Sequence, residues 1–228
     1  MIFLRALRRL WFALFLIAAA GVVVFAYLDY FMPFDLDRRP DFLTKFHLQS
    51  LKREPERCLA ALDRARISYR PVPPLSNDRG CGYEDAVRLQ GSAVNYGSNI
   101  LLRCPAMLGL LLWERHVLLP EAEAQFGKKL TAVRHLGTYS CRKIGGARGG
   151  SLSQHALANA IDIAGFALEG GESISLLRDW KEEGGKRRFL RAVRDGACRI
   201  FGVTLSPDFN AAHANHFHLD MGARSVCR

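Results

Sequence analysis

The sequence of 228 residues lacks the patterns by which several protein classes are recognised. It has no internal repeat and no low-complexity tract, and it has no Cys-x-x-Cys pair, which disfavours a zinc cluster built from cysteines. Its lysines and arginines are scattered, without a basic run interleaved with aromatics or a helix-turn-helix, zinc-finger or RNA-binding signature. The net charge of +10 suits an anionic partner such as a membrane surface or an acidic polymer. We therefore expect no nucleic-acid partner.

Charge is also absent from residues 11–28, WFALFLIAAAGVVVFAYL. At the helical rise per residue this run is about 27 Å long, which matches the hydrocarbon core of a membrane. Three arginines lie within residues 1–10, so we expect that end in the cytoplasm and the rest of the chain outside. The sequence predicts a single transmembrane anchor over 11–28. The alternative is a signal peptide cleaved near the three consecutive alanines, which would release the domain.

All of the cysteines follow the apolar run, and their number is even. An oxidising compartment favours disulfides, so cysteine usage agrees with export. Sequence spacing does not decide among the possible pairings. We expect Cys198 to pair with Cys227, bracing the C-terminal segment, and Cys58 to pair with Cys81. The six are Cys58, Cys81, Cys104, Cys141, Cys198 and Cys227.

The segment after the apolar run divides into a linker and one domain. Residues 29–52 contain two prolines and no sustained period, which is typical of a juxtamembrane linker. Residues 53–228 mix helical and strand patterns without strict alternation, so we expect an α+β fold, a small antiparallel sheet flanked by helices. The patterns predict helices over 54–67 and 104–127, the second bent near Pro120, strands over 129–142 and 159–168, and two helical stretches separated by Gly184 and Gly185.

Three of the seven histidines lie in HANHFHLD, residues 213–220. If NHFHLD is a strand, its period of two puts His216, His218 and Asp220 on one face, while Phe217 and Leu219 face the core. An HxH pair is weak evidence for a site, because many strands carry one. His213 falls outside the pair, so we expect it to line a cleft or to form a local hydrogen bond.

A second segment, SLSQHALANAIDI, contains His155 and Asp162. In a strand, Asp162 projects from one face while Ile161 and Ile163 pack on the other. A carboxylate between two isoleucines is costly to bury without a partner, and a metal ion is one such partner. A salt bridge or a loop cap is the alternative. Together the two segments offer a plausible set of ligands for one zinc ion, with three protein ligands and an open fourth position.

SLSQHALANAIDI resembles the SxHxxGxAxD signature of the zinc peptidases that cut peptidoglycan peptides, the D-Ala-D-Ala carboxypeptidase, murein endopeptidase and hedgehog-type superfamily. Its Ser, His, Ala and Asp are present, but Ala158 stands at the glycine position, a departure that removes no ligand. The HxH motif resembles the second signature of the murein endopeptidases. The chain most resembles the bacterial extensin-like C-terminal domain family, in TYSCRKI, LSQHALANAIDIAGF and FNAAHANHFHLD, over roughly residues 55–228.

The resemblance implies a role for each matching residue. His155, Asp162 and His218 would bind Zn²⁺, and His216 would act as the general base or orient the attacking water. Arg142, in YSCR, would bind a substrate carboxylate or stabilise the oxyanion, and a surface arginine without a role is the alternative. Asp220 would hydrogen-bond a histidine or end the strand.

The resemblance and the apolar run together imply a zinc metallopeptidase, single-pass in the inner membrane, whose periplasmic domain cleaves an amide bond in peptidoglycan stem peptides. A protein secreted to the periplasm after signal cleavage is the alternative topology. A non-catalytic module of the same fold, which binds or scaffolds the cell wall, is the alternative function, and a protein substrate also stays open.

Overall fold

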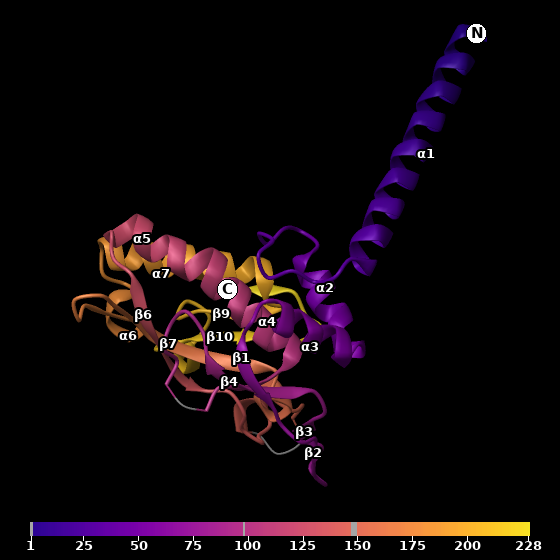
Figure 1. Cartoon of the computed structure of the whole chain (residues 1–228). Coiled ribbons are helices and arrows are strands. Elements are labelled where there is room, and N and C mark those ends of the chain that lie inside the picture. The colour runs from indigo at the N-terminus through magenta and orange to yellow at the C-terminus, as the bar shows by residue number, and fades with distance from the viewer. Residues whose placement is uncertain (1, 98, 147–149) are drawn as a thin grey trace. The chain divides into compact units, whose positions relative to one another are not determined.

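The computed structural model describes residues 2–97, 99–146 and 150–228, and divides them into two compact units that meet between Phe34 and Asp35. The segment 143–153, KIGGARGGSLS, is rich in glycine, which predicts a loop, and it lies partly outside the described residues. The helices are α1 (Ile2–Phe31), α2 (Thr44–Ser50), α3 (Pro55–Arg64), α4 (Cys104–Trp113), α5 (Leu119–Phe126), α6 (Leu176–Asp179) and α7 (Gly185–Ile200) (Figure 1). The strands are β1 (Ser68–Pro71), β2 (Leu75–Ser76), β3 (Gly82–Tyr83), β4 (Ala86–Gly91), β5 (Leu101–Arg103), β6 (Leu130–Gly137), β7 (Ala160–Leu168), β8 (Ser173–Ser175), β9 (Val203–Leu205), β10 (Phe217–Asp220) and β11 (Val226–Cys227).

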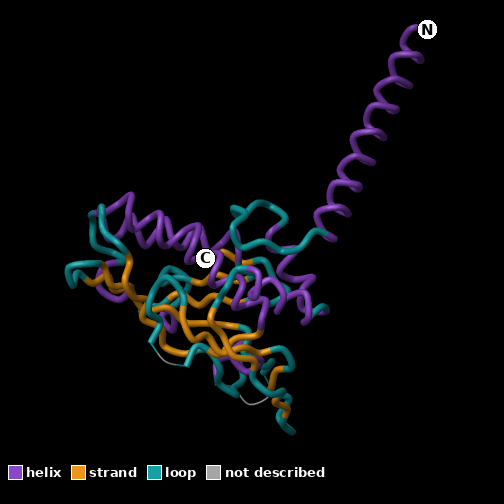
Figure 2. The backbone as a smooth tube through the Cα atoms, in the orientation of Figure 1, coloured by secondary structure: helices purple, strands orange, loops and turns teal. Residues whose placement is uncertain are grey.

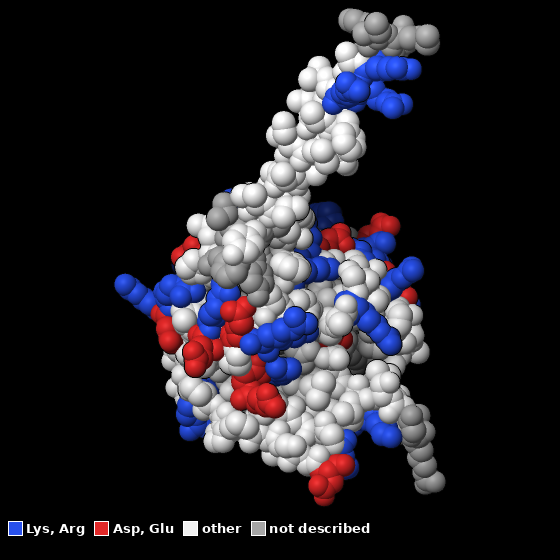
Figure 3. Space-filling view, turned by 90° about the vertical axis from the view of Figure 1, so that its right-hand side faces the viewer, with Lys and Arg blue, Asp and Glu red and all other residues white. Residues whose placement is uncertain are grey.

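The first unit consists mainly of α1, one long apolar helix. Its stretch Arg5–Phe25 is long and apolar enough to cross a membrane, and no part of it is buried against other residues. In the space-filling view, basic side chains gather near its far end and an uncharged stretch follows (Figure 3). The predicted apolar helix is thus confirmed in length and composition, properties that a membrane span and a signal sequence share.

The second unit combines a six-stranded sheet with helices. The sheet order is β11-β9-β10-β7-β6. Strand β8 pairs with the C-terminal half of β7, beyond the residues of β7 that pair with β10. All pairs in it are antiparallel except β11 with β9, which is parallel. Figure 2 shows the long helices gathered on one side of the strands. A mixed α and β fold with a largely antiparallel sheet is therefore confirmed. A separate three-stranded sheet has the order β1-β4-β5.

The centre of the core is α4, in which all ten residues are buried. A π-helical turn, Glu114–Leu118, joins it to α5, so the predicted helix over 104–127 is continuous and changes its winding just before Pro120. Gly127 ends the helix in the left-handed conformation, with φ of 59°. Trp113 packs edge to face against Phe166 of β7, which ties this helix to the sheet.

Helix α7 approaches the π-helical turn closely at Gly196. A Cβ placed on Gly196 would lie 2.4 Å from Cγ1 of Val117. We predict that Gly196→Ala lowers the free energy of unfolding by about 1–3 kcal/mol, because the added methyl overpacks this contact. Urea denaturation with the disulfides intact measures the change. Gly185→Ala is the matched control, since its Cβ would lie at an ordinary 3.4 Å from Phe126. Equal stability of the two variants would contradict the prediction.

Part of the segment predicted as a linker is helical and packs on the domain. Helix α2 buries Leu48, and the turn that follows it buries Leu51. Gln49 Nε2 donates hydrogen bonds to the carbonyl oxygens of Met221 and Gly222, at 3.1 and 2.9 Å. Gln49 of α2 therefore binds the residues that follow β10. These residues are about 170 positions away in the sequence, so no local sequence pattern predicts the contact.

Three disulfides close the domain: Cys58–Cys104, Cys81–Cys141 and Cys198–Cys227. The prediction for Cys198 and Cys227 is confirmed, and the pairing of Cys58 with Cys81 is wrong. Cys58 lies on α3, which packs against α4 where Cys104 is the first residue, and both side chains are fully buried. Cys81 precedes β3 and reaches the segment around Cys141 instead. Three disulfides indicate an oxidising compartment.

Candidate metal centre

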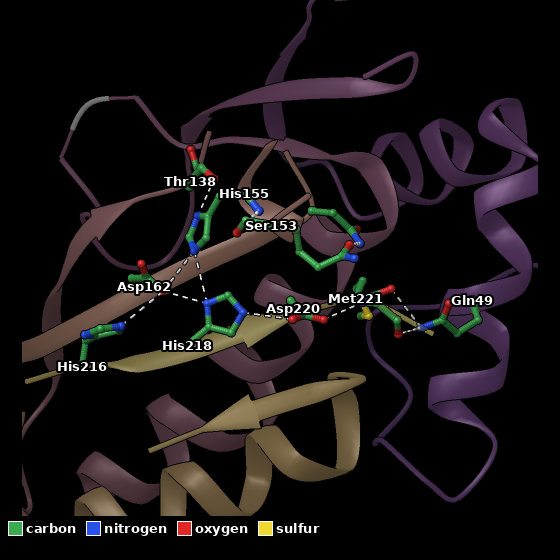
Figure 4. Close-up of polar contacts among 12 residues, drawn as sticks. Gln49, Thr138, Ser153, His155, Asp162, His216, His218, Asp220 and Met221 are labelled. Atoms are coloured by element: carbon green, nitrogen blue, oxygen red, sulfur yellow. Dashed lines mark hydrogen bonds and ion pairs between the residues drawn. The ribbon is translucent and has the colours of Figure 1, made fainter. Parts of the chain in front are cut away.

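Strands β7 and β10 bring the two sequence motifs together. His218 lies directly opposite Asp162 in the antiparallel pair, so their side chains project from the same face. The core face carries Phe217 and Leu219, both fully buried, as the strand period predicts. Figure 4 shows the histidines and Asp162 pointing toward one another. The sheet therefore places two groups that are 56 residues apart at hydrogen-bond distance.

His155 reaches the same point from a short helical turn before β7. Ser153 caps that turn, since its hydroxyl accepts a hydrogen bond from the backbone N–H of His155 at 3.3 Å. The turn ends at Ala158, which has φ of 49° and lies in the left-handed region. Glycine adopts this conformation at no steric cost, so the structure explains the glycine in the SxHxxGxAxD signature, and alanine here keeps the turn at some strain.

The three donor atoms form a small triangle. Asp162 Oδ1 lies 3.2 Å from His155 Nε2 and 2.9 Å from His218 Nδ1, and the two nitrogens are 3.2 Å apart. In a tetrahedral zinc site with ordinary bond lengths, neighbouring ligand atoms are about 3.3 Å apart. The side chains are 3%, 13% and 13% exposed for His155, Asp162 and His218, so the triangle is largely shielded from solvent. Its dimensions fit one metal ion.

The outer nitrogen of each histidine is already hydrogen-bonded. His155 Nδ1 lies 2.8 Å from the carbonyl oxygen of Thr138, to which only an N–H can donate. His218 Nε2 lies 2.9 Å from a carboxylate oxygen of Asp220, and the other oxygen of Asp220 accepts from the N–H of Gly222 at 2.6 Å. Because both outer nitrogens are bonded in this way, His155 Nε2 and His218 Nδ1 are the nitrogens that face the centre of the triangle, the arrangement found around metal-binding histidines.

Sequence reasoning anticipated Asp220 in this role and missed Thr138. A backbone carbonyl acts on His155, and every residue has one, so the identity of residue 138 carries no signal. Only the fold, in which Thr138 follows β6 beside the turn that bears His155, reveals the contact.

Replacing Asp220 with asparagine is expected to weaken zinc binding by about 10- to 100-fold, because the amide no longer holds the His218 ring with a charge. Competition titration against a chromophoric chelator measures the affinity. Asp195→Asn, on the exposed side of α7, is the control and should leave the affinity unchanged. An unaltered affinity in Asp220→Asn would show that the contact does not support the site.

The charges around the triangle oppose the cost of burial. Burial raises the pKa of Asp162, but hydrogen bonds from His155 and His218 outweigh it and hold that pKa well below its usual range. Burial lowers the pKa of His218, but its hydrogen bonds to Asp162 and Asp220 prevail and raise the pKa to about 9. Without metal, His218 is therefore a cation between two carboxylates at neutral pH.

This arrangement predicts a pH dependence for the metal-free protein. The folded-state pKa of His218 is above the unfolded value, so its stabilising contribution is complete below pH about 6.5 and is lost as pH rises through about 9. The loss in the free energy of unfolding is up to roughly 3 kcal/mol. Urea titrations with a chelator present, at intervals from pH 6 to 9.5, test this. The His218→Gln variant should show a flatter profile, and a wild-type profile as flat as that of the variant would refute the prediction.

The remaining candidates lie around the triangle. His216 Nε2 is 3.6 Å from Asp162 Oδ1, and its Nδ1 bonds to the Asn215 side chain at 2.8 Å. Burial lowers the pKa of His216, so its ring is neutral and able to accept a proton. His213 bonds locally to Asn210 at 2.7 Å. Arg142 is exposed, and its charge contributes to lowering the pKa of both histidines, so it lies within electrostatic range of the site.

A family described as "Extensin-like protein C-terminus" matches residues 56–228. The chain belongs to this family. No curated protein and no solved structure matches the chain. The part of this extensin-like protein that the family covers contains all three residues of the triangle, all of the disulfides and the whole sheet. Helices α1 and α2 lie before residue 56, where the family match begins. The contact of Gln49 with the residues after β10 therefore involves a helix outside the matched region.

Proposed function

We propose that this extensin-like protein is a zinc-dependent hydrolase that cleaves an amide bond in peptidoglycan stem peptides. The observation that carries the proposal is the convergence of His155 Nε2, Asp162 Oδ1 and His218 Nδ1, with the outer nitrogen of each histidine already bonded. The likeness of SLSQHALANAIDI to the signature of the zinc peptidases supports the choice of metal and reaction. Two histidines and one carboxylate also serve iron(II) in other proteins, so the metal is to be identified by analysis.

Each residue near the proposed metal position has a separate role. A zinc ion supplies Lewis acidity, which polarises a carbonyl group and makes water acidic enough to attack it near neutral pH. His155, Asp162 and His218 hold the ion. His216 accepts the proton of the attacking water at Nε2, since its other nitrogen is bonded to Asn215. Arg142 binds a substrate carboxylate or the developing oxyanion.

The full chain in detergent, reconstituted with zinc and with its disulfides intact, tests the proposal. Purified muropeptides are incubated with it, and mass spectrometry reads both the products and the metal content. We expect about one zinc per chain and the appearance of shortened peptides. A chain that stays metal-free after reconstitution and yields no product would refute the hydrolase.

We further propose that α1 anchors the protein in the inner membrane with the domain in the periplasm. Support comes from the length of the apolar stretch and from the three arginines that precede it. Carbonate extraction followed by mass measurement of both fractions distinguishes the outcomes: the full-length mass in the membrane fraction supports the anchor, and a protein without the N-terminal segment in the soluble fraction indicates a cleaved signal.

A further inference from the structure

A pocket of about 580 Å³ lies beside β6, on the edge of the sheet that carries the metal centre. Asn95, in the segment before β5, forms two backbone hydrogen bonds with β6: its N–H donates to the carbonyl of Thr131 and its carbonyl accepts from the N–H of Val133, both at 2.9 Å. Leu101, the first residue of β5, donates to Oγ1 of Thr138, the residue after β6, at 3.3 Å. The pocket opens beside these contacts. Its lining includes Tyr96, Gly97, Arg134, Leu136 and Ala164.

The pocket and the metal centre adjoin one another. Ala164 lies two residues after Asp162 on β7, so the two side chains project from the same side, about 7 Å apart. Gly137 of β6 pairs with Asp162, and Thr138, the next residue, holds His155 through its carbonyl. In Figure 1, β6 and β7 lie side by side. A chain lying along β6 thus reaches both the pocket and the donor triangle.

Arg134 brings a positive charge to this surface. It pairs with Gly165 across the two strands, and its Nη2 donates a hydrogen bond to the carbonyl of Ile174 at 3.3 Å. A Cβ on Gly165 would lie 2.6 Å from that Nη2, so the absence of a side chain at Gly165 lets the guanidinium cross β7. In the described part of the chain no carboxylate forms an ion pair with Arg134, and its charge is uncompensated.

The position of this charge fixes the spacing of a ligand. Gly165 is three residues from Asp162, which is at most about 10 Å along the strand, because the pairing of β6 with β7 shifts register between these positions. An extended peptide rises about 3.3 Å per residue, so a group at Arg134 lies about three residues from a bond at the metal centre.

We propose that this pocket is a binding subsite for an anionic group of a peptide, with Arg134 as the specificity-determining cation. The identification of the peptide rests on the proposed function, in which the bond to be cut lies at the donor triangle. The ligand is a short peptide with a free carboxylate about three residues from that bond. Leu136, which is exposed, contacts its apolar part, and the guanidinium of Arg134 binds the carboxylate.

Peptide binding to the full chain in detergent, with the metal removed, tests the subsite without any need for cleavage. The probes are the fluorescently labelled stem peptide Ala-γ-D-Glu-Lys-D-Ala-D-Ala and analogues in which one free carboxylate at a time is a carboxamide. We expect the wild-type protein to bind one of these analogues about tenfold more weakly than it binds the unmodified parent peptide. Arg134→Gln should bind that analogue and the parent equally, and Arg134→Lys should restore the preference in part.

Arg70→Gln is the matched control, since Arg70 is an exposed arginine on β1 of the three-stranded sheet. This variant should keep the wild-type preference. The subsite is refuted if the parent does not bind, if no amidation weakens binding to the wild type, or if Arg134→Gln keeps the preference. The same peptides with the zinc-loaded chain report on cleavage separately. An Arg134-dependent preference in a chain that never cuts would refute the hydrolase and leave the subsite standing.

Discussion

Replacing His218 with alanine is expected to weaken zinc binding at least about a hundredfold. Structural zinc sites with four ligands bind with about 12 kcal/mol, so one ligand contributes roughly 3 kcal/mol, or about two powers of ten. His218 stands at the centre of the site, because its ring contacts Asp162 through one nitrogen and Asp220 through the other. Its loss removes a ligand and leaves two buried carboxylates facing each other without a cation, which further disfavours the native geometry.

Elemental analysis after zinc loading and dialysis, followed by competition titration, measures the effect. His213→Ala is the matched control: it is a histidine five residues earlier, in the turn before β10, whose Nδ1 bonds to Asn210 and whose ring is outside the triangle. The control should bind zinc like the wild type. If His218→Ala retained one zinc per chain with wild-type affinity, the triangle would not be the metal centre, whatever the fate of the enzymatic proposal.

The strand period alone predicted how the C-terminal motif is oriented. Phe217 and Leu219 are apolar and alternate with polar residues, so their burial fixes the face of His218 and Asp220. The sequence could not show that β10 lies beside β7, because pairing between strands separated by more than 40 residues depends on the whole sheet. The likeness to the zinc peptidase signature implied that Asp162 and His218 share a site, but it did not specify the strand pairing that brings them together.

The disulfides show the same limit. Cys198 and Cys227 are joined because the end of α7 and β11 meet beside β9, so the expected brace of the C-terminal segment is confirmed. Cys58 and Cys81 are closer in sequence than Cys58 and Cys104, yet packing of α3 on α4 determines the partner. Spacing gives no information on which helix will lie against which, and the error follows from that.

The rigid parts of the domain support the site from several directions. Gln49 of α2 holds the carbonyl of Met221, the residue after Asp220. Cys81–Cys141 ties the segment that bears Arg142 to the hairpin of β2 and β3. A site assembled from a turn, two strands and an outer helix needs such supports, since a ligand displaced by about 1 Å loses much of its binding.

Replacing His216 with alanine is expected to lower kcat for muropeptide cleavage by about 10²- to 10⁴-fold while the chain keeps its zinc. His216 Nε2 lies 3.6 Å from Asp162 and is not needed to complete the triangle, so metal binding and proton transfer are separable here. Parallel assays of zinc content and product formation make the comparison. His213→Ala, whose ring centroid is 5.1 Å from that of His216, is the control and should lose far less activity.

The pair of measurements also separates the enzyme from a cell-wall module of the same fold. A module would bind zinc and sacculi in both the wild type and His216→Ala and release no product from either. An enzyme whose base is elsewhere would cut equally well in both, which would contradict the role given to His216. Only loss of turnover at constant zinc content supports that role, because the His216 ring is neutral and its Nε2 lies 3.6 Å from Asp162 Oδ1, beside the triangle.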